Sequence, residues 1–167
     1  MIKKKGFTLI ELIIYVGILG VVSLIIVNFF GVFGRTRAQN EARTEVEDNL
    51  RLAIEKISRD VRIASAISLP AAGGQSSTLG ITIGGVSTTY QISGQGILQR
   101  VSGGTVLDIT SNKVVVANNS DNFVRTDNSG GNIRSITLQV NLLISYASQG
   151  RPDFIYSNTG KTAITIR

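Results

Sequence analysis

The chain has no histidine, cysteine or tryptophan, and only two of its 167 residues are proline. Without His and Cys it can build neither a Ser-His-Asp nor a Cys-His triad, and it lacks the nitrogen and sulfur ligands of a typical zinc site. A disulfide is excluded as well, so the shape must depend on packing. The length suits one compact domain with an appendage, or one modest domain.

Negative charge is in the minority, with 11 Asp and Glu against 17 Lys and Arg and a net charge of +6. Lys3, Lys4 and Lys5 supply half of that excess. The remainder of the chain has no dense basic stretch and few aromatic residues, so we expect no direct binding of nucleic acid.

A long apolar run follows the lysines. Leu12 to Phe33 are 22 uncharged residues, about 33 Å as a helix at 1.5 Å per residue, which matches a bilayer core of about 30 Å. The run predicts a single-pass segment in contact with membrane lipid. Glu11 is the one charge between Phe7 and Gly34. A carboxylate in a lipid-facing helix is costly, so we expect Glu11 to have a partner, to reach the headgroups or to be protonated.

The flanks of the run bear on processing and orientation. Three lysines before it favour a cytoplasmic N-terminus, although Arg35, Arg37 and Arg43 follow it. A conventional signal peptide has a shorter apolar run and a cleavage site after it. Residues 32–34 make a poor site of that kind, so the layout alone favours an uncleaved anchor.

Residues 3–12, KKKGFTLIEL, closely resemble the leader and mature start of type IV prepilins and type II secretion pseudopilins. The resemblance implies that a prepilin peptidase cuts the leader lysines away between Gly6 and Phe7 and that Phe7 is then methylated. It also implies a subunit held in the cytoplasmic (inner) membrane, with its head extracytoplasmic. An inner-membrane assembly platform would then bundle it with other pilin or pseudopilin subunits into a filament at the cell surface or in the periplasm.

The resemblance gives Glu11 a role in assembly, because the family's embedded glutamate meets the N-terminal amine of an adjacent subunit. A lone carboxylate in a low dielectric is costly, whereas a paired one is tolerated. The pair would therefore mark the register between subunits. Where many major pilins have a proline, this chain has Asn28, which departs from the major-pilin pattern.

Beyond the apolar run, apolar or small residues recur in steps of three and four, as on one face of a helix. This stripe comprises Ala38, Ala42, Val46, Leu50, Ala53, Ile57, Val61 and Ala64. No Pro or Gly interrupts residues 35–67, so we predict one helix from about Phe7 to about Ile67. The stripe needs a cover, and the remaining chain is the obvious candidate.

Residues 70–77 begin with a proline and read as a linker, and short β-branched runs separated by glycines follow. They predict strands at 79–83, 86–92, 96–101, 105–109, 113–117, 133–146 and 163–166. Gly84-Gly85 predicts a two-residue hairpin turn and Ser102-Gly103-Gly104 a longer one. The pattern predicts an α+β fold, with a meandering antiparallel sheet packed on the second half of the helix, and this agrees with the pilin fold.

Four regions are expected. Residues 1–6 form a basic leader, 7–34 a transmembrane and filament-core helix, 35–69 its amphipathic continuation, and 70–167 a β-rich head. Residues 52–62 and 90–100 are similar to segments of J-type minor pseudopilins and W-type minor pilins, although a charged helix and a generic hairpin explain them equally well.

The leading interpretation is a minor pilin or pseudopilin of a type IV pilus, type II secretion or DNA-uptake filament. The alternatives are a major pilin, or a membrane-anchored extracytoplasmic binding or sensor module that does not assemble.

Two oxygen-rich loops, 118–122 and 127–132, have side chains that could ligate Ca²⁺, but the same residue types form tight turns. We expect solvated turns, with no metal and no cofactor. Acid-base chemistry would have to use aspartates that each lie in a predicted turn or strand end: Asp108, Asp121, Asp127 and Asp153. We therefore do not expect an enzyme.

Overall fold

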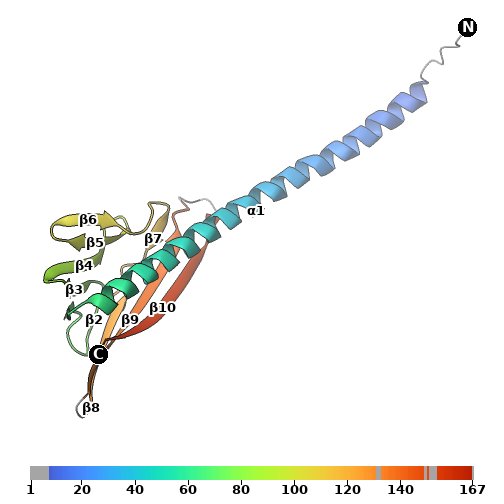
Figure 1. Ribbon diagram of the computed structural model, residues 1–167. Helices are drawn as coiled ribbons and strands as arrows, with labels where there is room; N and C mark the ends of the chain where they lie inside the picture. Colours follow the sequence, from blue (N-terminus) through green and yellow to red (C-terminus); the bar gives the residue numbers. More distant parts are fainter. Residues whose placement is uncertain (1–7, 131–132, 149, 151–153, 167) are drawn as a thin grey trace, which may run out of the picture. The chain divides into compact units, whose positions relative to one another are not determined.

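The computed structural model describes residues 8–130, 133–148, 150 and 154–166 (Figure 1). The chain forms two compact units, Met1–Ala38 and Gln39–Arg167. The fold is α+β, as predicted: one helix, α1 (Leu9–Ile63), precedes ten antiparallel strands in the described part of the chain.

Helix α1 ends four residues before the predicted end near Ile67. The amide of Ser65 donates to the carbonyl of Thr82 at 2.8 Å, and strand β1 (Ala66–Leu69) begins at the next residue. Pro70 disfavours the helical conformation at Leu69. The chain therefore leaves the helix for a strand instead of completing another turn.

The first unit contains the apolar part of α1. Leu9–Phe30 has 22 residues with a mean hydropathy of 2.7, long and apolar enough to cross a membrane. Its large apolar side chains are exposed. Asn28 does not break the helix, because its amide donates to the carbonyl of Leu24 at 2.9 Å and so satisfies a polar group inside the helix itself.

The strands of the second unit form two five-stranded antiparallel sheets instead of the single sheet expected. The first sheet has the order β1-β3-β4-β5-β6, with β3 at Leu79–Ile83, β4 at Val86–Ile92, β5 at Leu98–Ser102 and β6 at Thr105–Asp108. The second has the order β10-β9-β8-β2, with β10 at Ser157–Ile166, β9 at Ile133–Tyr146, β8 at Phe123–Gly130 and β2 at Gln75–Ser76. Strand β7 (Val114–Val116) also pairs with β9.

Two Gly-Gly pairs turn the chain in the first sheet. Gly84 and Gly85 have φ of 56° and 81°, and Gly103 and Gly104 have φ of 56° and 82°. Positive φ at both central residues is the type I′ requirement, which Gly meets at no steric cost. Ser102 pairs directly with Thr105, so this second turn is also a two-residue turn and the longer one predicted there is wrong.

Strands β1, β2 and β8 were not predicted from the sequence. Residues 75–76 had the composition of a linker and 127–130 that of a loop. Strand β8 nevertheless pairs with β9 at eight successive positions, so the partner strand overrides the local turn preference.

Both sheets contribute to one core around the predicted stripe of α1. Of the predicted stripe, Ala42, Val46, Leu50, Ala53, Ile57 and Val61 are buried on α1, Ala64 is buried just after the helix ends, and Ala38 is only half-buried. Tyr90 and Leu98 reach them from the first sheet, and β9 adds its alternate residues Leu138, Val140, Leu142 and Ile144. Figure 1 shows β9 and β10 running alongside the second half of α1. A side chain added at Gly160 of β10 would place its Cβ 2.5 Å from Cδ1 of Ile54, so glycine allows this close approach.

Candidate functional site

Glu11 lies in the first turn of α1, where it caps its own helix. The amide of Thr8 donates to Glu11 Oε2 at 3.5 Å, and the amide of Glu11 donates to Thr8 Oγ1 at 3.4 Å. Reciprocal bonds of this kind form a capping box, in which two helix-end amides that lack intrahelical partners are satisfied. The Thr-x-x-Glu signature is visible in the sequence, so this role of Glu11 was predictable from it.

The contacts around Glu11 are long for hydrogen bonds, and the side chain is exposed. A negative charge in the first turn is also favoured by the partial positive charge of the helix N-terminus. Glu11 therefore has a structural role within its own chain, while its carboxylate stays accessible to an external cation.

The other residues of the predicted processing site lie outside the residues that the structure describes: Lys3, Lys4, Lys5, Gly6 and Phe7. Their roles stay predictions from the resemblance.

Asp60 is a buried charged residue of the head. Only 5% of the residue is exposed. Its Oδ2 accepts a hydrogen bond from the hydroxyl of Tyr90 at 2.8 Å and one from Nε of Arg100 at 2.7 Å. Residues 52–62 and 90–100 therefore meet at Asp60. Nothing in the spacing of these segments along the chain predicted this contact.

The pKa values around Asp60 reflect its position. Burial, followed by the hydrogen bond to Asp60, raises the pKa of Tyr90 well above its usual range. The hydrogen bond to Asp60 also raises the pKa of Arg100, against the opposing effect of burial. The Tyr90 hydroxyl and the ion pair of Asp60 with Arg100 therefore tie α1 to the first sheet.

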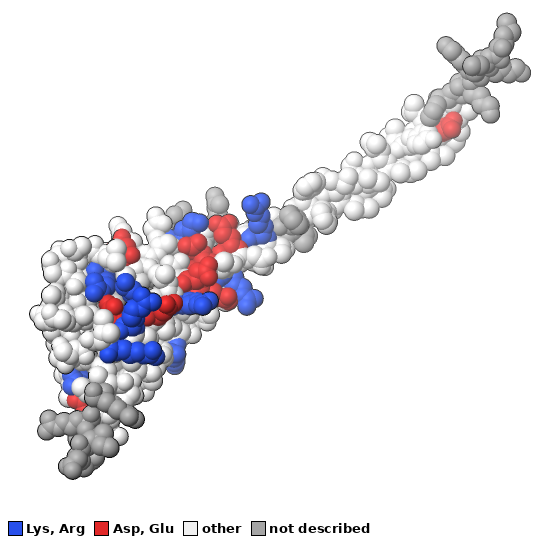
Figure 2. Space-filling view, in the orientation of Figure 1, with Lys and Arg blue, Asp and Glu red and all other residues white. Residues whose placement is uncertain are grey.

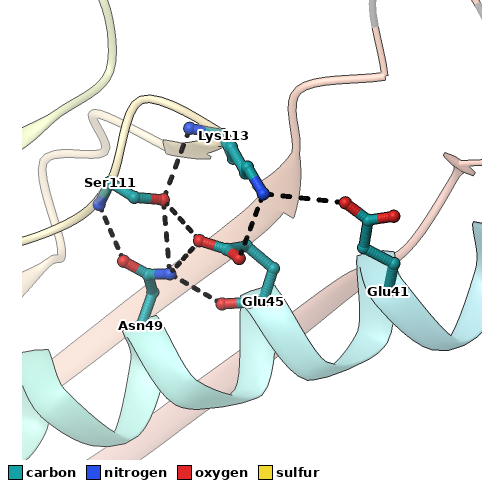
Figure 3. A network of polar contacts seen from close by, with 5 residues as sticks. All are labelled: Glu41, Glu45, Asn49, Ser111 and Lys113. Atoms are coloured by element: carbon teal, nitrogen blue, oxygen red, sulfur yellow. Dashed lines mark hydrogen bonds and ion pairs between the residues drawn. The ribbon is translucent and has the colours of Figure 1, made fainter.

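A second polar cluster joins α1 to the loop before β7 (Figure 3). The hydroxyl of Ser111 donates to Glu45 Oε1 at 2.7 Å, and its amide donates to Asn49 Oδ1 at 2.8 Å. Lys113 lies 3.6 Å from Glu41 and 3.9 Å from Glu45. The short hydrogen bonds fix the loop, whereas the longer ion pairs at half-exposed side chains are weak.

A third cluster ties the segment before β10 to the helix through Glu47. Nε of Arg43 donates to Glu47 Oε1 at 2.8 Å, and the hydroxyl of Tyr156 donates to the same oxygen at 3.0 Å. The hydrogen bond from Arg43, followed by that from Tyr156, lowers the pKa of Glu47. The charged groups of these clusters serve to position elements.

The aspartates considered for calcium or catalysis are distributed over separate elements. Residues 118–122 form a turn region, as expected, but Asp127 lies in β8 and pairs with Arg125 at 2.6 Å, so the loop predicted from residue 127 is wrong at its start. Asp108 in β6 accepts a hydrogen bond from Gln99 at 2.8 Å. Asp153 lies outside the described residues, and within them no group of three or more His, Cys, Asp and Glu could hold a metal ion.

Known proteins resemble part of this chain, including the start of α1. The family described as the prokaryotic N-terminal methylation motif matches residues 1–27. The chain is 32% identical over 63 residues to "Pilin-like protein PilA3" of Thermus thermophilus. That match covers 38% of this chain and 27% of the relative's length. No solved structure matches the chain.

The apolar first half of α1 and the antiparallel sheets after it give an α+β, pilin-like fold. The methylation motif and the pilin-like relative support its assignment to the type IV pilin family. The motif and the apolar helix are consistent with membrane anchoring and a pilus or surface location.

Proposed function

We propose that this chain is a minor pilin or pseudopilin, a structural subunit of a type IV pilus, type II secretion or DNA-uptake filament. The observation that supports it most is an exposed apolar helix of membrane length that begins within the N-terminal methylation motif, with one carboxylate in its first turn. Exposed apolar surface of this extent needs lipid or other apolar helices as its environment.

In this proposal a prepilin peptidase cuts after Gly6 and removes the leader with Lys3, Lys4 and Lys5. The new amine at Phe7 is methylated and carries a positive charge. The N-terminus lies on the cytoplasmic side of the inner membrane and the head outside. An assembly platform in that membrane then draws residues 7–34 into the filament core while residues 70–167, with the helix they cover, form the head.

Glu11 has two uses in succession in this proposal. In the free subunit it caps its own helix through Thr8, over distances of 3.4–3.5 Å. In the filament it pairs with the Phe7 amine of an adjacent subunit, since a bond between two charged groups is stronger than a long bond to a neutral one. The ion pair is tolerable in an apolar core because the attraction between the charges offsets their lost solvation.

A pair of Glu11 variants separates capping from charge. Glutamine also serves in a capping box, so Glu11→Gln keeps the cap and removes only the charge, whereas Glu11→Ala removes both. We expect both variants to be cut and methylated, as seen by mass spectrometry of the N-terminal peptide, and both to be lost from sheared filaments. A Glu11→Gln chain that entered filaments normally would contradict the pairing role.

Two measurements address the alternatives. Expression with and without a prepilin peptidase distinguishes a pilin from an anchored binding or sensor module, because the module would keep residues 1–6 and their mass. Abundance distinguishes a major pilin, which would dominate sheared filaments, from a minor subunit, which would be scarce.

A further inference from the structure

The edge strands of the head differ in how well their free sides are protected. An edge strand presents unpaired backbone amides and carbonyls, and proteins usually keep such edges short, irregular, charged or covered. Strand β2 has two residues and β6 has four. Strand β1 pairs with β3 in an irregular register, and the carbonyl of Ile67 accepts a hydrogen bond from Nη1 of Arg125 at 2.9 Å. These three edges are therefore short or capped.

Strand β10 is the long edge strand. All ten of its residues pair with β9 in one continuous register, and no other strand in the described part of the chain pairs with it. The amide of Tyr146 donates to the carbonyl of Tyr156 at 2.9 Å, so every second residue of β10 from Asn158 onward bonds to β9. The residues between them direct their amides and carbonyls to the free side. They are all exposed: Ser157, Thr159, Lys161, Ala163 and Thr165.

One amide on the free side has a substitute partner. The amide of Thr159 donates to Oδ1 of the adjacent Asn158 at 2.8 Å instead of to β9. The bond is exposed and local, so exchanging it for a bond to an incoming strand changes the free energy little.

A groove adjoins this edge on the side of α1. It has a volume of about 450 Å³ and is lined by Asn158 of β10 and by residues of α1: Glu47, Leu50, Arg51, Ile54 and Glu55. Leu50 and Ile54 make it apolar beside Gly160, where a Cβ would lie within 3.0 Å of both side chains. A side chain on a neighbouring strand opposite Gly160 would therefore contact them.

The charges beside the edge that lack a partner are positive. Figure 2 shows side chains of both signs gathered over the second half of α1. Within the groove, Glu47 and Glu55 already form ion pairs along α1, at 2.8 and 3.0 Å. Arg51 in the groove and Lys161 on the other face of β10 make no ion pair with any residue that the structure describes. The edge is therefore complementary to an acidic segment.

From the free edge and the adjoining groove we propose that β10 accepts an extended acidic segment of another protein as an additional strand of the second sheet. Main-chain hydrogen bonds to the free side of β10 hold the segment, and alternate side chains give specificity. An acidic residue of the segment opposite Lys161 forms a cross-strand ion pair. The next residue, opposite Gly160, is apolar and enters the groove over Leu50 and Ile54. This site lies wholly in the head and requires neither cleavage nor assembly.

A second copy of the chain is the less suitable occupant. Two antiparallel copies of β10 paired about their middle would place Lys161 opposite Lys161, and like charges directly opposite each other are destabilising. Strand β6 of a second copy would cover only four residues of the ten. A different protein with a longer acidic segment fits both the length of the edge and its charge.

The test uses the full-length, ¹⁵N-labelled chain in detergent micelles and a synthetic peptide as long as β10. The peptide alternates threonine and valine, with glutamate followed by leucine at its centre. Saturating peptide should slow hydrogen exchange by at least about tenfold at the amides of Lys161, Ala163 and Thr165, because these amides gain hydrogen bonds. The same peptide with N-methyl groups on the residues that face β10 cannot pair with the edge and should leave exchange unchanged.

Variants locate the site and its charge preference. Proline is accepted on an edge strand where the amide faces solvent, so Ala163→Pro should leave the head folded and abolish peptide binding. Val106→Pro in the edge strand β6 is the matched control and should leave binding unchanged. Lys161→Ala should weaken binding about two- to fivefold, the range for one exposed ion pair. It should also remove the preference over a peptide with lysine in place of glutamate.

The possible outcomes separate the occupants. No slowing at β10, or equal slowing with the N-methylated peptide, overturns the addition of a strand. Slowing at β6 instead overturns the choice of edge. Slowing at β10 that rises with protein concentration without peptide identifies a second copy and overturns another protein as occupant. Because the chain in this measurement is neither cut nor assembled, each of these failures would leave the proposed function standing.

Discussion

The two halves of α1 have the same backbone and opposite environments. In Leu9–Phe30 the large apolar side chains are exposed, whereas from Ala42 onward one stripe of the helix is buried under two sheets. A helical repeat of apolar residues occurs only in the second half, because only there is one face of the helix covered. A uniformly apolar helix needs a uniformly apolar environment, so the first half needs lipid or other apolar helices around it.

The largest expected difference is between the same isoleucine truncation made in each half of α1. Ile57 is fully buried and Ile18 is 57% exposed. Ile57→Ala should destabilise the head by about 2–5 kcal/mol through lost transfer energy and the cavity left behind, and Ile18→Ala should leave head stability unchanged. Chemical denaturation of the full chain in detergent measures both. Equal losses would show that the apolar half also contributes to the folded head.

Asp60→Ala should have the next largest effect. The substitution leaves Arg100 and the Tyr90 hydroxyl without the carboxylate that they bind. Breaking a buried ion pair usually lowers the free energy of unfolding by roughly 3–5 kcal/mol. Because the Arg100 side chain is 23% exposed, we expect a loss of about 2–4 kcal/mol. The matched control is Glu55→Ala in the exposed pair with Arg59, which should cost less than about 1 kcal/mol. Thermal unfolding followed by circular dichroism measures the loss of stability in both variants. Indistinguishable losses would show that Asp60 contributes no more than an exposed ion pair.

Substitution of a glycine tests how closely β10 approaches α1. A Cβ at Gly160 would lie 2.5–3.0 Å from the ends of Ile54 and Leu50, whereas one at Gly94 meets nothing within 4 Å. Gly160→Ala should therefore destabilise the head by about 1–2 kcal/mol through overpacking. Gly94→Ala should be neutral or stabilise it by about 0.5 kcal/mol, since alanine restricts the unfolded chain. A gain in stability with Gly160→Ala would show a looser contact between helix and strand.

The smallest expected effect is a pH dependence of the stability of the head. The pKa of Glu47 is lowered in the folded state by Arg43 and Tyr156. The contribution of Glu47 to the stability of the head is therefore fully present above the ordinary carboxyl pKa of 4.5. It is lost as the pH falls through the lower pKa of the folded state. Unfolding midpoints of the wild type and Glu47→Gln should converge as the pH falls below that range. A constant difference between them would mean that Glu47 does not titrate with folding.

The sequence predicted most strongly those elements whose pattern is local. The bounds of β3, β4 and β9 agree with prediction, because alternating β-branched runs end at glycines or turn residues. The helix stripe was correct from Ala42 to Ala64, since its steps of three and four need no partner to be recognised.

Features that depend on a distant partner were missed. Strand β8 contains Asp127, Asn128 and Ser129, which favour turns, and it is a strand because β9 pairs with it. Asp60 is one of several charges on a charged helix, and only its 2.7–2.8 Å contacts with Tyr90 and Arg100 distinguish it. The proposed processing residues are a different case, because they lie outside the residues that the structure describes and depend on the sequence motif alone.

The capping box at Thr8 and Glu11 bears on how a subunit changes surroundings. Its contacts of 3.4–3.5 Å keep the opening turn wound before any neighbour is present, so docking requires no refolding there. Bonds that long are also exchanged at little cost. In the proposed filament, Glu11 would exchange its bond with Thr8 for one with a neighbour's amine, and it could form the first bond again when a subunit leaves.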